Sequence, residues 1–103
     1  MEIIVKKDLV FDDKYNIKPI GKIDTVTAVE FGTTVNDAID DYSINHLTLD
    51  FSEVAYVSSM GLRVLLELVK KMNSKGSFNI INTPDSVKEV FVITGFDKII
   101  QIS

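Results

Sequence analysis

The sequence contains no cysteine, and its only histidine is His46. A chain without cysteine forms no disulfide and no thiolate metal site, and one imidazole cannot build a histidine cluster for zinc. A lone histidine at the start of a strand is typical of a polar edge residue. We therefore expect no metal site and no cofactor.

The chain also lacks the residues of a catalytic site. Its sequence offers no set of base, nucleophile and oxyanion-binding group, and no glycine-rich loop that could cradle a phosphate. We therefore expect no catalytic residue and no enzymatic activity.

The chain has fewer basic than acidic residues, since it contains 11 Lys and Arg and 15 Asp and Glu, which give a net charge of −4. An acidic chain without a basic patch makes nucleic acid and anionic membrane poor partners. No apolar run approaches the length of a transmembrane helix, and the first residues lack the basic and apolar regions of a signal peptide. The expectation is a cytoplasmic protein that does not insert into a membrane.

The length and the apolar content are those of one packed domain. At 103 residues the chain has room for a single domain, 1–103, and 46% of its residues are hydrophobic. A chain of this size buries roughly two-thirds of the surface that it exposes when unfolded, which is enough for a core.

The stretch from residue 46 to 76 organises the chain. Apolar residues first alternate with polar ones, as in a strand, at Leu47, Leu49 and Phe51. They then recur at helical spacing, at Leu62, Leu65, Leu66, Val69 and Met72. The period changes at Ser58 and Ser59, where a serine can cap the new helix.

The helical spacing also predicts part of the core. Leu65, Leu66 and Val69 are expected to face the sheet, with Phe31 and Phe91 on the neighbouring helices. On this prediction, Leu66→Ala would cost roughly 2–5 kcal/mol of stability.

Two strands and a helix are predicted before this stretch. Residues 2–7 and 15–23 are expected to be strands of a hairpin, joined by a polar turn. Pro19 cannot donate a ladder hydrogen bond, so the second strand must be an edge or bulged there. A helix is expected to start near Asp24, where Thr27 and Glu30 fit a capping box.

The segments after residue 76 continue the alternation of strands and helices. Residues 77–82 form the next predicted strand. A helix is then predicted to start with Thr83 as its cap and Pro84 in its first turn, and to end at Gly95. Residues 98–102 form a last predicted strand. From residue 47 onward the predicted order is strand, helix, strand, helix, strand. This order indicates parallel strands with right-handed crossovers. The predicted fold class is α/β: a mixed sheet of about five strands, an N-terminal hairpin followed by parallel β-α-β-α-β, packed against three or four helices.

Two motifs resemble those of the STAS domain family, the anti-sigma factor antagonists and their relatives. Residues 49–66, Leu-Asp-Phe-Ser-Glu-Val-Ala-Tyr-Val-Ser-Ser-Met-Gly-Leu-Arg-Val-Leu-Leu, are similar to the family's aspartate-ended strand, short connector and Asp/Ser-Ser-x-Gly-Leu helix start. Residues 21–24, Gly-Lys-Ile-Asp, are similar to its Gly-x-Leu/Ile-Asp element. The resemblance runs from about Tyr15 to the last residue and implies a STAS-like fold.

The resemblance also implies a function in transcription regulation. Proteins of this type bind an anti-sigma factor that is a serine kinase, and so free a sigma factor. The kinase phosphorylates a serine at the helix start, which breaks the complex, and a phosphoserine phosphatase restores binding. Aligned on Gly61, that serine is Ser59, and Ser58, at a position where aspartate is common, is the less favoured site. The implied partner-binding residues are Asp24, Ser58, Ser59, Met60, Gly61 and Arg63.

Simpler alternatives stay open beside this function. Ser58, Ser59 and Asp24 are also what ordinary helix caps require. The same resemblance accommodates a non-switching scaffold, such as a small cytoplasmic subunit of a transporter complex. A homodimer is also compatible with the sequence.

Overall fold

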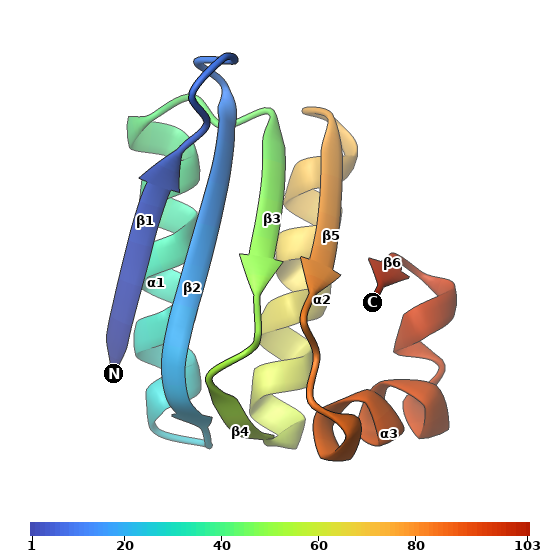
Figure 1. Ribbon diagram of the computed structural model, residues 1–103. Helices are drawn as coiled ribbons and strands as arrows, with labels where there is room; N and C mark the ends of the chain where they lie inside the picture. Colours follow the sequence, from blue (N-terminus) through green and yellow to red (C-terminus); the bar gives the residue numbers. More distant parts are fainter.

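A mixed six-stranded sheet with two long helices on one face forms the body of the molecule, as the computed structural model of residues 1–103 shows (Figure 1). The strands are β1 (Glu2–Lys7), β2 (Lys14–Ile23), β3 (His46–Asp50), β4 (Val54–Val57), β5 (Ser77–Ile81) and β6 (Gln101–Ile102). The helices are α1 (Thr27–Asp41), α2 (Ser59–Asn73) and α3 (Asp85–Thr94), followed by a 3-10 turn, η1 (Phe96–Lys98). No helix combines the length and the apolar character needed to cross a membrane.

The predicted fold class is confirmed. β1 and β2 form the antiparallel hairpin, and β3 and β5 are parallel to their neighbours in the order β1-β2-β3-β5-β6. The sheet has one strand more than expected, because residues 54–57 of the predicted connector form β4, which pairs with β2. The last strand is shorter than predicted, since only Gln101–Ile102 pairs with β5.

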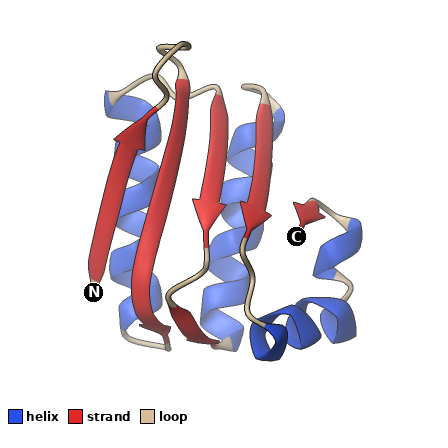
Figure 2. Cartoon of the chain, viewed as in Figure 1, coloured by secondary structure: helices blue, strands red, loops and turns tan.

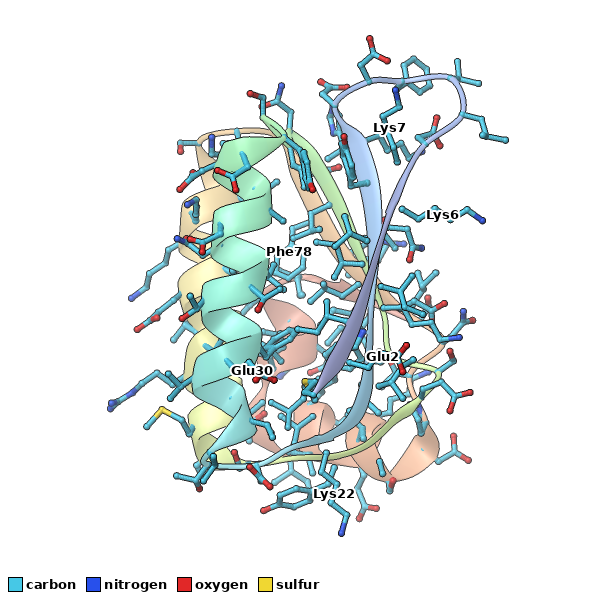
Figure 3. The ribbon with its side chains drawn as sticks, turned by 90° about the vertical axis from the view of Figure 1, so that its left-hand side faces the viewer. Glu2, Lys6, Lys7, Lys22, Glu30 and Phe78 are labelled. Carbon is cyan, nitrogen blue, oxygen red and sulfur yellow. The ribbon has the colours of Figure 1, made fainter.

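The core lies between the sheet and the helices α1 and α2, which share one side of the sheet (Figure 2). Alternation along β3 follows the prediction: Leu47 and Leu49 are buried, whereas Thr48 and Asp50 are only partly buried on the opposite face. Figure 3 shows Phe78 of β5 pointing between the sheet and the helices. The opposite face carries no helix, and its side chains are mostly polar.

Pro19 lies where β2 changes its neighbour. β2 pairs with β3 up to Ile17 and with β4 from Gly21 onward, so that neither strand pairs with Pro19. The missing N–H therefore costs no ladder hydrogen bond on this side. The register shifts between Gly21 and Lys22, and Gly21 has φ +119°, as the prediction of an irregular strand requires.

Two predicted helix caps are wrong in detail. Glu30 does not close a capping box with Thr27, because its carboxylate pairs with the amino group of Met1, 2.6 Å away. For α3 the N-cap is Pro84, and the hydroxyl of Thr83 is buried without a hydrogen-bond partner. The predicted end of α3 is confirmed, since Gly95 is the C-cap with φ +77°.

The inner face of α2 differs from the predicted one at two positions. Leu65 and Val69 are buried as predicted, but Leu66 is only half-buried and Leu68 is 3% exposed. The pattern alone could not show that α1 packs beside α2 and covers the side on which Leu68 lies. Leu66 lies at an open groove beside η1 instead.

This difference changes the expected effect of two substitutions. Leu68→Ala should lower the free energy of unfolding by about 2 kcal/mol, because it removes buried methyl groups and leaves a cavity. Leu66→Ala should cost about 1 kcal/mol or less, because its side chain keeps contact with solvent in the folded state. Urea unfolding of both variants measures the difference, and an equal or larger loss for Leu66→Ala would contradict the packing of α2.

Candidate functional site

The residues Ser58–Gly61, which we call the serine turn, lie at the end of the sheet where β2 and β4 stop (Figure 1). Ile23 of β2 is paired with Val57 of β4, and the backbone N–H of Ser58 donates to the carbonyl of Ile23 at 2.8 Å. Asp24 and Ser58 are therefore the first residues after two neighbouring parallel strands. The fold thus brings the two predicted motifs together at one edge.

The two serines have different environments. Ser58 is the N-cap of α2 and is 7% exposed, and its Oγ accepts a hydrogen bond from the N–H of Gly61 at 3.1 Å. Ser59 is the first residue of the helix, its side chain is exposed, and its hydroxyl has no hydrogen-bond partner within the protein. The capping role that the sequence allows for both serines thus belongs to Ser58, and Ser59 presents a free hydroxyl to solvent.

Gly61 lets the helix start close to the two strands. A Cβ at this position would lie 2.9 Å from Cγ2 of Ile23 and 2.9 Å from Cγ1 of Val57. These distances are shorter than real carbon contacts allow, so only glycine fits without movement of the strands. Gly61 and Ser58 are both buried, and they shape the turn from within.

Asp24 organises the neighbouring turn before α1. Its Oδ1 accepts hydrogen bonds from the N–H groups of Thr27 (2.8 Å) and Val26 (2.9 Å), and its own N–H donates to the Thr27 hydroxyl at 2.9 Å. The hydrogen bond from the Thr27 N–H, with smaller contributions from the Thr27 hydroxyl and Val26, holds the pKa of Asp24 below its usual value. Asp24 is therefore a negatively charged cap that remains partly exposed beside the serine turn.

Asp50, at the end of β3, braces the segment that leads to the serine turn. Its Oδ1 accepts from the N–H of Ser52 at 2.9 Å and from Nδ2 of Asn82 at 3.4 Å. Partial burial raises the pKa of Asp50, but the hydrogen bonds from Ser52 and Asn82 and the charge of Lys18 outweigh it, so the pKa lies below its usual value.

Asp50 should make the stability of the protein depend on pH. Because its folded-state pKa lies below the unfolded value of about 3.9, its charge stabilises the fold above that pH and this stabilisation is lost as the pH falls through the folded pKa. We expect Asp50→Asn to lower stability by about 1 kcal/mol at neutral pH, with the difference from wild type shrinking as the pH falls through the lowered folded-state pKa of Asp50.

Denaturant melts at several pH values measure this dependence. Asp97→Asn is the matched control, because Asp97 is exposed and has no hydrogen bond or ion pair within the protein. A loss for Asp50→Asn that is the same at acidic and neutral pH would show that the charge of Asp50 contributes nothing.

An open groove continues the serine turn between α1 and α2. Its volume is about 440 Å³, and α2 contributes Met60 and Arg63 to it. Opposite them, α1 contributes Val29, which is 61% exposed. Arg63 is exposed and forms no ion pair. Sequence reasoning missed Val29, although an apolar residue off the buried stripe of α1 could have indicated it.

No three side chains of the His, Cys, Asp and Glu type are grouped closely enough to hold a metal ion. The site therefore consists of an exposed hydroxyl, a groove lined by apolar residues together with Arg63 and Glu67, and a partly exposed carboxylate. These features suit the binding of a protein.

Comparisons with known proteins agree on one family. A family model described as STAS domain matches residues 7–103. An anti-sigma-B factor antagonist from Listeria monocytogenes is 31% identical over 94 residues, which cover 87% of this chain and 79% of the relative. A crystal structure from Thermotoga maritima, provisionally named an anti-sigma factor antagonist, has a TM-score of 0.87 and 25% identity over 97% of this chain and 84% of that chain. An anti-sigma factor antagonist from Mycobacterium paratuberculosis has the same fold, with a TM-score of 0.82 and 24% identity over 98% of this chain and 85% of that chain.

Proposed function

Because this chain belongs to the STAS domain family, we propose that it is an anti-sigma factor antagonist that binds an anti-sigma serine kinase and is switched off by phosphorylation of Ser59. The name of the Listeria relative supports the role as an anti-sigma factor antagonist. The different environments of the two serines support Ser59 as the phosphorylated residue. Transcription by a sigma factor would then depend on whether Ser59 carries a phosphoryl group.

The exposure of Ser59 is the observation that carries the proposal. A kinase must bring the serine oxygen to the γ-phosphate of its nucleotide, which a free hydroxyl at the first residue of a helix permits. The hydroxyl of Ser58 is buried and is engaged with Gly61. Phosphorylation of Ser58 would require the first turn of α2 to open, so Ser59 is the favoured site.

The fold should accept a phosphoryl group on Ser59. The group adds about −1.5 to −2 charges, and the N-terminus of a helix favours negative charge because its N–H groups are unpaired. The first turn of α2 contains no acidic side chain. Arg63 follows four residues later on the same helix, at a spacing that allows it to pair with the phosphoserine.

The partner surface should not accept the same group. We infer that the kinase covers Ser59, Met60 and Arg63, with Asp24 at the rim of the interface. The groove next to Val29 would receive an apolar side chain of the kinase. A phosphoryl group at the centre of this surface would be desolvated, and Arg63 alone would neutralise only part of its charge of about −1.5 to −2. It would also withdraw Arg63 from the interface. Both effects remove the protein from its partner while leaving it folded, and a phosphoserine phosphatase would restore binding.

The intact mass of the protein purified from its own cells tests this proposal. We expect a fraction of the molecules to carry one phosphoryl group, and fragmentation should place it on Ser59. Modification of Ser58 instead would overturn the site. An unmodified protein that also fails to bind any serine kinase would favour the alternative of a non-switching scaffold, such as an accessory subunit of a transporter complex.

A further inference from the structure

β1 is the edge strand of the sheet, and nothing covers its outer side. It is the first strand in the sheet order, and it pairs with β2 in regular register along all six of its residues. Figure 3 shows β1 nearest to the viewer, with no helix or loop in front of it. Ile4 and Val5 are 45% and 36% exposed. Natural proteins often protect such an edge with a proline, a bulge or charged side chains. β1 has neither a proline nor a bulge, and its charged residues are Glu2, Lys6 and Lys7.

The register shows which backbone groups of β1 face outward. The N–H of Asp8 donates to the carbonyl of Lys14 at 2.8 Å, and these two residues continue the register of the hairpin. Because residues in an antiparallel pair alternate, the main-chain groups of Ile4 and Lys6 point to β2, and those of Ile3 and Val5 point away from it. The position of Pro19 agrees with this assignment. Pro19 lies opposite Ile3, and a residue opposite an outward-facing residue donates no hydrogen bond to β1.

We propose that this edge pairs with the same edge of a second copy of the chain, antiparallel and about a two-fold axis at Ile4. A two-fold axis perpendicular to the sheet keeps each face on its own side, so residues opposite each other must share a face. Glu2, Ile4 and Lys6 share the open face, away from the helices, as Figure 3 shows for Glu2 and Lys6.

The sequence of β1 is complementary to itself in this register. With Ile4 opposite Ile4 of the second copy, Glu2 lies opposite Lys6 of the second copy, and this charge pair occurs twice by symmetry. On the other face, Ile3 lies opposite Val5, and such a pair exchanges both main-chain N–H···O bonds. Other nearby registers that also keep each side chain on its own face of the sheet do not place Glu2 opposite Lys6, so they lack these charge pairs. This self-complementarity favours a second copy over a strand from another protein.

The dimer should be weak. An interface of one short strand per copy is small compared with the interfaces of stable complexes. We expect a dissociation constant of about 100 µM. The serine turn follows β4, which pairs with β2 on the side opposite to β1, so dimerisation should not depend on the phosphorylation state of Ser59.

Sedimentation equilibrium of the full chain, from about 10 µM to 1 mM, tests the dimer with a backbone variant. Val5→Pro removes an outward N–H but no hydrogen bond to β2, so the fold should persist and the dimer should be lost. A wild type that stays monomeric at about 1 mM, or a folded Val5→Pro variant that still dimerises, would overturn the proposal.

A charge exchange tests the register without touching the backbone. Glu2→Lys and Lys6→Glu should each weaken dimerisation about tenfold, because each sets like charges opposite each other twice. An equimolar mixture of the two variants should dimerise like wild type, since two lysines then face two glutamates. Lys88→Glu makes the same charge change on α3, away from the edge, and should have no effect. A mixture that stays as weak as its components would exclude this register.

Amide hydrogen exchange provides an independent readout. Protection of the Ile3, Val5 and Lys7 amides should rise with protein concentration, whereas Ile4 and Lys6, which already bond to β2, should not change. Protection that rises elsewhere and leaves these three amides unchanged would place the contact on another surface.

Discussion

Ser59→Asp is expected to bind an anti-sigma serine kinase at least about tenfold more weakly than wild type, a loss of about 1.4 kcal/mol, without a change in fold. The substitution adds negative charge at an exposed residue of the first turn of α2. The helix N-terminus accepts that charge, whereas an interface that covers it leaves it desolvated and unpaired. Ser59→Ala should bind the kinase persistently and incorporate no phosphate. Calorimetric titration and phosphate incorporation measure the two effects.

Ser58→Ala is the matched control for these variants. It should lose the capping hydrogen bond to Gly61 and about 1 kcal/mol of stability, and it should still bind the kinase and be phosphorylated. If Ser58→Ala abolished phosphate incorporation while Ser59→Ala did not, Ser58 would be the switch. If no serine kinase bound the wild type, the proposed function itself would fail.

Gly61→Val should be among the most destabilising single substitutions in the chain, with a loss of about 3 kcal/mol or more in the free energy of unfolding. Even the first added carbon would lie 2.9 Å from side-chain carbons of Ile23 and Val57 and 3.2 Å from the carbonyl oxygen of Ile23. Helix α2 would have to move away from β2 and β4. This movement would also disturb the capping hydrogen bond of Ser58.

Glu67→Ala is the control in the same helix. Glu67 is exposed and forms no ion pair in the structure, so its replacement should change stability by no more than about 0.5 kcal/mol. Thermal and urea unfolding of both variants measure the difference. Equal unfolding midpoints for the two variants would show that a valine side chain fits at position 61, contrary to the close contacts of Gly61 with Ile23 and Val57. Ser59 phosphorylation in Gly61→Val should also be altered, because the turn that presents the hydroxyl is displaced.

Much of the fold and of the site followed from local patterns. The change of period at Ser58 located the start of α2 correctly, and the hairpin and the end of α3 at Gly95 were also predictable. Each of these features depends on the conformational preferences of a few successive residues, or on the alternation of apolar side chains within one element. Such preferences act whatever the rest of the chain does.

Other features depended on which distant segments meet. Residues 54–57 are a strand because β2, some thirty residues earlier, offers them an unpaired edge. Leu68 is buried and Leu66 is not because α1 packs beside α2. Neither result is encoded in the local spacing, since a single helix or a four-residue segment does not determine which neighbour covers it.

The sequence by itself determined that the chain is an acidic α/β protein without cysteine chemistry, with two serines at the start of a helix and a STAS-like motif around them. Only the tertiary structure decided which serine is accessible. The pairing of β4 with β2 places Ser58 against the carbonyl of Ile23 and buries it, and the helix that follows turns Ser59 outward. Local sequence gives both residues the same hydroxyl and the same capping preference, and burial, which comes from packing against distant strands, makes them different.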